Sequence, residues 1–75
     1  MFRYRISGDN RTVTLLRWLT DEQAIRLLHS HEMLHRARGM FKELVELKLE
    51  KEIFDNSGMT TSSEELDRVN VSEND

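Results

Sequence analysis

The chain has 75 residues, of which 33% are charged and 37% hydrophobic, and it contains no cysteine and no proline. This length allows one domain at most, and without cysteine the protein has neither a disulfide nor a thiolate zinc site. The N-terminal residues lack the apolar stretch of a signal peptide, and no segment approaches the roughly 20 apolar residues of a membrane span. We therefore expect a cytoplasmic protein.

The net charge of −3 is unevenly distributed along the chain. Residues 1–42 carry eight Lys and Arg against four acidic residues, which gives +4, whereas residues 43–75 carry three against ten, which gives −7. Two interpretations fit this asymmetry. It indicates a basic contact surface with an acidic tail, or two solvated faces that keep the protein soluble.

The N-terminus has the pattern of a β-hairpin. Apolar and basic side chains alternate over residues 2–6 (FRYRI), which is the two-residue period of a strand. The turn-forming sequence SGDN follows, and residues 11–17 are again rich in β-favouring residues. We predict strands at 2–6 and 11–17. Because a lone hairpin is barely stable in water, one of its faces must pack on a helix.

A helix begins at residue 21. Thr20 and Gln23 have the spacing of a capping box, in which each side chain binds the backbone N–H of the other residue. Leu19 and Ala24 occupy the positions of a hydrophobic staple, and acidic residues fill the first turn. The sequence predicts a short helix over about 21–29.

A long amphipathic helix is predicted next, over about 31–54. In one straight helix, the apolar residues before residue 30 and those after it would lie on different faces, so they could not contact the same partner. The helix therefore breaks near 29–31, with Ser30 as a second N-cap, or it continues and packs against different partners at its two ends; we favour the break. The apolar residues before and after Gly39 lie on the same helix face, so we expect the helix to continue through Gly39 and to end near Phe54.

Residues 59–75 are dominated by Ser, Thr, Asn and acidic residues, and they contain too few apolar side chains to offset the entropy of ordering. We expect a disordered acidic C-terminal tail after a single small domain at 1–58. The predicted fold is thus mainly α with a short N-terminal β-hairpin, a small α+β protein.

His31-Glu32-Met33-Leu34-His35 matches H-E-x-x-H, the zinc-binding signature of zincin metalloproteases, and the resemblance covers these five residues only. On a helix, His31 and His35 lie on one face and can both reach a zinc ion, while Glu32 would act as general base on its bound water. A catalytic zinc needs a third protein ligand, and no histidine follows His35. We predict no metal, no cofactor and no enzymatic activity; a non-catalytic metal site and a zinc-dependent hydrolase are the outside alternatives.

An apolar stripe runs along the predicted long helix. Its members are Met33, Ala37, Met40, Phe41, Leu44, Val45, Leu47 and Phe54. The stripe is either ordinary core covered by the hairpin, or a surface for self-association. We favour self-association, because a five-residue strand covers only about half of a helix of this length. A homodimer with antiparallel helices would bury the rest.

A second candidate surface lies on the hairpin. It consists of Arg3, Tyr4, Arg5, Arg11 and Arg17. Arginines bind phosphates and a tyrosine stacks on a base, so this surface is a candidate nucleic-acid contact. The alternative is an edge strand whose charges prevent aggregation.

The function that we predict is a small regulatory or adaptor protein that binds a protein partner through its amphipathic helix and acts as a homodimer. The alternative is a weak nucleic-acid-binding accessory protein that uses its basic N-terminal half.

Overall fold

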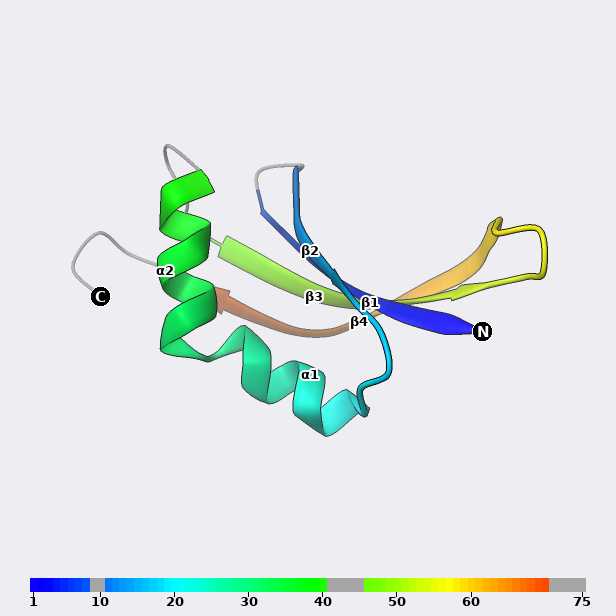
Figure 1. The fold of residues 1–75 in the computed structure, drawn as a ribbon, viewed down its shortest axis with the longest axis horizontal. Coiled ribbons are helices and arrows are strands. Elements are labelled where there is room, and N and C mark those ends of the chain that lie inside the picture. The colour runs from blue at the N-terminus through cyan, green and yellow to red at the C-terminus, as the bar shows by residue number, and fades with distance from the viewer. Residues whose placement is uncertain (9–10, 41–45, 71–75) are drawn as a thin grey trace.

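The computed structural model describes residues 1–8, 11–40 and 46–70. They form a four-stranded antiparallel sheet with the strand order β2-β1-β3-β4, and two short helices between the second and third strands. The prediction of a mainly α fold is therefore wrong: this is an α+β protein in which strands predominate (Figure 1).

The predicted N-terminal hairpin is present. β1 (Phe2–Gly8) pairs antiparallel with β2 (Arg11–Leu16), and one register shift follows Ile6. The two-residue alternation of β1 sorts its side chains as expected, with Tyr4 and Ile6 fully buried and Arg3 only partly exposed on the opposite face.

The predicted helix at residue 21 is also present, as α1 (Asp21–Leu28). The backbone N–H of Gln23 donates to Thr20 Oγ1 at 3.1 Å, and the N–H of Thr20 donates to Gln23 Oε1 at 3.0 Å, so the capping box is complete. Ala24 and Leu28, one helical turn apart, are buried against the sheet.

The predicted break near 29–31 separates α1 from α2 (His31–Met40). Ser30 Oγ accepts a hydrogen bond at 3.1 Å from the backbone N–H of Met33, as an N-cap residue does. The break turns the chain so that Met33 and Ala37 also reach the core.

The prediction of one long helix over 31–54 is wrong. The described part of α2 ends at Met40, and residues 46–54 form β3 (Glu46–Phe54), which pairs antiparallel with β1. Leu47 and Leu49 are fully buried beneath the helices, while Glu46, Lys48 and Glu50, at the alternate positions, lie toward the other face. Glu, Leu and Lys favour helices, but this segment forms a strand because its alternate apolar side chains then complete the core.

The prediction of a disordered tail is wrong for residues 60–70, which form β4 (Thr60–Asn70). β4 pairs with β3 along its whole length, with two register shifts. Leu66 and Val69 pack on the core at its C-terminal half. β3 is held in place by its pairing with β1 and supplies the backbone hydrogen-bond partners of β4, so β4 needs few apolar side chains of its own. The remaining tail residues, 71–75, lie outside the described part.

The sheet and the helices form two layers. The core between them consists of Tyr4, Ile6, Ala24, Leu28, Met33, Ala37, Leu47 and Leu49. Both helices lie toward one end of the sheet, whereas the other end, which holds the N-terminus and the β3–β4 turn, projects past α1 (Figure 1). The Cα atoms extend over 42 × 23 × 16 Å, so the molecule is elongated along this direction. Neither described helix has the length and apolar character needed to cross a membrane.

Candidate protein-binding surface

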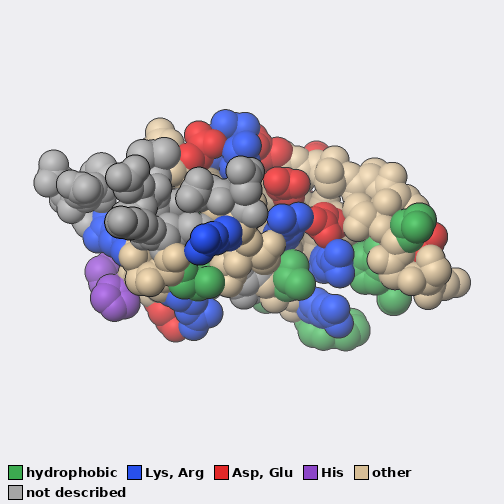
Figure 2. Space-filling view, turned by 90° about the horizontal axis from the view of Figure 1, so that it is seen from above, with side chains coloured by type: hydrophobic (Ala, Val, Ile, Leu, Met, Phe, Trp, Pro, Cys, Tyr) green, Lys and Arg blue, Asp and Glu red, His purple; other side chains and the backbone are tan. Residues whose placement is uncertain are grey.

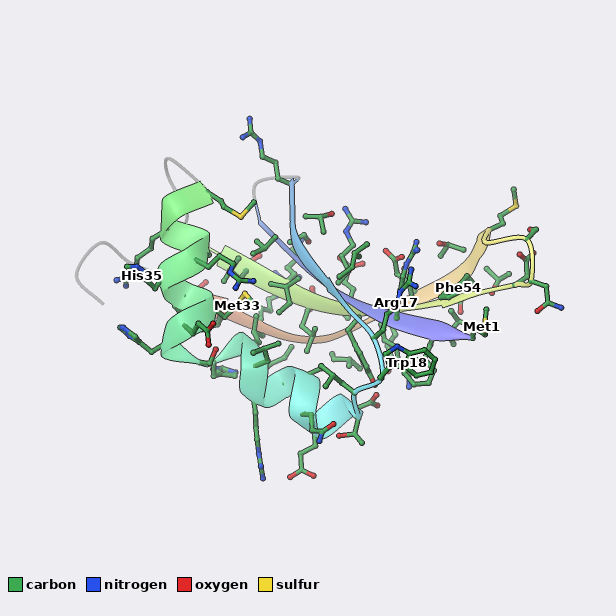
Figure 3. The ribbon with its side chains drawn as sticks, in the orientation of Figure 1. Met1, Arg17, Trp18, Met33, His35 and Phe54 are labelled. Carbon is green, nitrogen blue, oxygen red and sulfur yellow. The ribbon has the colours of Figure 1, made fainter. Side chains whose placement is uncertain are left out.

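The two histidines of the HExxH motif lie on α2 and are both exposed. Their rings stack with 6.2 Å between centroids and 20° between planes, and the side chain of His35 points away from the sheet (Figure 3). Within residues 1–8, 11–40 and 46–70, no third histidine, aspartate or glutamate joins them to make a metal-binding group. The motif here supplies two imidazoles on a solvent-exposed helix face.

The third histidine contacts a carboxylate on another element. His29, which follows α1, lies with Nε2 2.7 Å from Asp67 Oδ2 on β4. This hydrogen bond is the largest cause of the lowered pKa of Asp67. His29 thus ties the end of α1 to the edge strand.

On the sheet face opposite the helices, the two strand arginines converge on one glutamate. Arg3 Nε donates to Glu52 Oε2 at 2.9 Å, and Arg5 Nη1 donates to Oε1 at 3.2 Å. Glu52 is 7% exposed. Its burial alone would raise its pKa, but the hydrogen bonds and charges of the two arginines outweigh that effect and lower the pKa. Basic and acidic side chains alternate along this face (Figure 2).

Tyr4 lies on the helix side of the sheet and is fully buried. Its hydroxyl donates to the carboxylate of Asp21, which also accepts from Lys51 Nζ at 3.1 Å. Burial and the bond to Asp21 raise the pKa of Tyr4 to about 12. A base cannot stack on this ring, and Arg3 and Arg5 both bind the carboxylate of Glu52, so the geometry weighs against the predicted nucleic-acid surface at these three residues.

Arg11 and Arg17, the other two members of that surface, differ from them. Arg11 is the first residue of β2 and Arg17 follows its last residue, and both are exposed. Among the described residues, neither has an acidic side chain within ion-pair distance.

The structure distributes the predicted interface stripe over two elements. Met33, Ala37 and Leu47 are buried in the core, Met40 is 48% exposed at the end of α2, and Phe54 is half-buried on β3, where Arg3 lies over its ring. Phe41, Leu44 and Val45 fall outside the described residues. The single helical stripe does not exist, although the prediction of self-association itself stays open.

A different set of apolar side chains is exposed. Trp18 is 95% exposed, Met1 75%, Ile53 46% and Phe2 45%. Phe2 and Ile53 are directly paired on β1 and β3, and the carbonyl of Met1 accepts from the N–H of Phe54 at 3.0 Å. Figure 3 shows Trp18 and Met1 at the same projecting end of the molecule. We call Met1, Phe2, Trp18 and Ile53 the apolar end.

The apolar end has a polar border. Lys51 Nζ lies 4.5 Å from the centroid of the Phe2 ring and also bonds Asp21, so a cation and a carboxylate lie beside the exposed apolar side chains, while the Phe2 ring itself packs edge-on against Tyr4 of the core. An apolar centre bordered by charged groups is typical of a protein-binding patch.

Trp18 has an unusual backbone. Its φ is 64°, in the left-handed region that side chains other than glycine rarely adopt. The residue lies in the connection between β2 and α1, where the chain leaves the sheet and turns into the helix cap. Strain of this kind is often found at functional positions. Sequence analysis did not single out Trp18, although a lone tryptophan between two predicted elements was a visible signal.

Comparisons with protein-family models, with curated proteins and with solved structures found no match.

Proposed function

We propose that this protein is a small non-catalytic binding protein that associates with itself through the apolar end and acts on a protein partner. The observation that carries the proposal is the exposure of Trp18 at the end of the molecule that also holds Met1, with Phe2 and Ile53 exposed on the strands there (Figure 3). Tryptophan is among the residues that contribute most to protein–protein binding, and clustered exposed apolar side chains mark interaction sites.

The proposal moves the self-association surface from the α2 side of the molecule to its opposite end. A two-fold dimer would place the apolar end of one copy against that of the other, since a self-complementary apolar patch meets no charge repulsion at its centre. The fixed Lys51–Asp21 pair at its border offers one cation and one carboxylate to the same pair in the second copy.

Light scattering over the micromolar range tests the proposal. We expect twice the chain mass of 8.9 kDa for the natural sequence, and a single chain for Trp18→Ser. Met40→Ser is the matched control, because it removes an exposed methionine from the predicted helix stripe at the other end of the molecule.

A mass of one chain throughout this range would refute self-association. A dimer that survives Trp18→Ser but dissociates in Met40→Ser would instead place the interface on α2.

A further inference from the structure

The sheet surface that faces the helices is not covered along its whole length. α1 begins at Asp21, and the end of the sheet that holds the N-terminus projects past it (Figure 1). Phe2 lies on the same face as the buried Tyr4, because alternate residues of a strand share a face, and the two rings pack edge-on with 5.5 Å between centroids. On β3, Ile53 shares a face with Lys51, which bonds Asp21 on the helix side. Phe2 and Ile53 are therefore exposed apolar residues of the helix-facing surface.

β4 extends this surface. Ser62 pairs with Ile53, and directly paired residues of antiparallel strands point to the same face. The next residue, Ser63, pairs with Glu52 and so lies on the opposite face. We call Phe2, Ile53 and Ser62 the uncovered sheet face.

The register of the hairpin explains why Phe2 stays exposed. Tyr4 pairs with Leu16. Continued by two residues, this register would place Trp18 directly opposite Phe2, where two aromatic rings pack well. Instead β2 ends at Leu16, and the backbone of Trp18, with φ 64°, turns out of the strand conformation. Because Trp18 is 95% exposed, its ring covers almost nothing of its own chain.

Each copy of the protein thus has one exposed indole and one uncovered apolar pair, and these two features complement each other. Figure 3 shows Trp18 on the same side of the sheet as α1, which is the side of the uncovered sheet face. A two-fold axis at this end brings Trp18 of each copy to the uncovered sheet face of the other, so the contact is made twice. Lys51 Nζ, which lies over the Phe2 ring, provides a cation at the border where an incoming aromatic ring is favoured.

We propose that Trp18 of one copy packs on Phe2 and Ile53 of the second copy, and that Trp18 of the second copy packs on the first in the same way. This inference rests on the proposed self-association and names the residues that each copy contributes. In the alternative arrangement, the two Trp18 rings contact each other on the axis and leave Phe2 and Ile53 in water. Reciprocal packing is favoured because it removes all three apolar side chains from water.

Fluorescence follows this contact directly, because Trp18 is the single tryptophan of the chain. At micromolar concentration, we expect the natural protein to emit at the shorter wavelengths of a buried indole. Dilution should move the emission to longer wavelengths over the same concentration range in which light scattering shows the mass fall from two chains to one.

Two variants that complement each other test the reciprocity. Trp18→Lys and Ile53→Glu change exposed side chains outside the core, so each is expected to fold, as circular dichroism will show. Each variant alone should dimerise at least about tenfold more weakly than the natural protein. Mixed in equal amounts they should form a heterodimer. At one contact the natural Trp18 packs on the natural Ile53, and at the other the introduced lysine meets the introduced glutamate.

The mixture has its own fluorescence readout. Its only tryptophan belongs to the Ile53→Glu chain, so a move of the emission to shorter wavelengths on mixing reports the packing of that Trp18 on the other chain. A contact between two Trp18 rings cannot form in this mixture, because one chain lacks the indole.

Ser62→Asp and Ser63→Asp are matched controls for the face of the sheet. Both add one negative charge at neighbouring exposed positions of β4, but only Ser62 lies beside Ile53. We therefore expect Ser62→Asp to weaken the dimer at least about tenfold and Ser63→Asp to leave it unchanged.

Three results would overturn reciprocal packing and leave the proposed self-association in place. They are a dimeric natural protein whose Trp18 emits as an exposed indole, folded complementary variants that stay monomeric when mixed, and a dimer that Ser63→Asp weakens more than Ser62→Asp. A natural protein with the mass of one chain throughout the micromolar range would instead refute the self-association itself, and reciprocal packing with it.

Discussion

The hydroxyl of Tyr4 donates a hydrogen bond to the carboxylate of Asp21, and this bond joins the central strand β1 to the first turn of α1. Asp21 lies at the positive end of the helix dipole and accepts from Lys51 as well. One carboxylate thus fixes the position of the helix on the sheet through two strands.

The first prediction concerns this bond at alkaline pH. Tyr4 is the single tyrosine of the chain, so the phenolate absorbance reports on it alone. We expect a midpoint at about pH 12 rather than 10, and a lower midpoint in Asp21→Asn. Because the pKa is raised in the folded protein, the stabilisation is complete below about pH 10 and is lost as pH rises through about 12.

Tyr4→Phe should lower the free energy of unfolding by about 1–2 kcal/mol, since it removes a hydrogen bond to a charged group. An unchanged free energy, or a midpoint near pH 10 in the natural protein, would contradict the assignment.

The second prediction concerns Glu52, which both strand arginines contact. Glu52→Ala should destabilise the protein by about 1–3 kcal/mol, because it leaves two partly buried guanidinium groups without their acceptor. The pKa of Glu52 is lowered in the folded protein, so its contribution is present above about pH 4.5 and is lost as pH falls through the lower folded value.

The acid limb of the stability curve, measured by urea unfolding, should therefore be flatter in Glu52→Gln. Glu50→Gln, two residues earlier on the same face of β3, is the control and should keep the steep limb. Equal slopes in the two variants would show that Glu52 is not the group responsible.

The third prediction concerns β4. Ending the chain after Met59 removes a strand that pairs with the whole of β3 and exposes the core beside Leu66 and Val69. Burying two such side chains contributes at least about 2 kcal/mol, so we expect the truncated chain to lose that stability or its cooperative thermal transition. Leu66→Ala in the full chain should cost about 1 kcal/mol. A truncated chain with the melting temperature of the full chain would show that β4 is dispensable.

The fourth prediction concerns the HExxH motif. After gel filtration in buffer that contains zinc, elemental analysis should find no stoichiometric metal, because the described part of the chain offers two exposed imidazoles and no third ligand, and such a pair holds zinc loosely. His31→Ala and His35→Ala should unfold at the same temperature as the natural protein. One zinc per chain, lost in both variants, would reverse this conclusion.

The parts of the fold that sequence analysis predicted are those with strong local signals. The alternation of Tyr4 and Ile6 with arginines, and the Thr20–Gln23 capping box, act over a few residues and need no partner. Ser30 likewise marks the helix break, since its hydroxyl oxygen accepts a hydrogen bond from the backbone N–H of Met33.

The missed strands have physical explanations. Residues 46–54 contain strong helix formers, and their apolar residues keep the helical spacing that begins in α2. The alternation typical of a strand covers only Leu47, Lys48 and Leu49, so the helical pattern extended over more residues. β4 has almost no apolar signal, because it is ordered by β3 rather than by its own burial. Non-local pairing of this kind cannot be found from either segment alone.

The candidate surface was missed for a related reason. Sequence analysis sought apolar stripes, and Met33, Ala37 and Leu47 turned out to form the core. Trp18 belongs to neither period, because it lies in the connection between β2 and α1 and not in a helix or strand.

At Trp18 the left-handed backbone lowers the stability of the fold, whereas the exposed ring is the main contact of the proposed interface. For a residue other than glycine this conformation costs roughly 1–2 kcal/mol, and a ring that is 95% exposed returns little packing energy. Trp18→Gly should therefore leave the protein at least as stable. A library selected only for resistance to heat or protease would discard the tryptophan, whereas one selected for association would keep it, and sequencing both populations would identify position 18 without any knowledge of the partner.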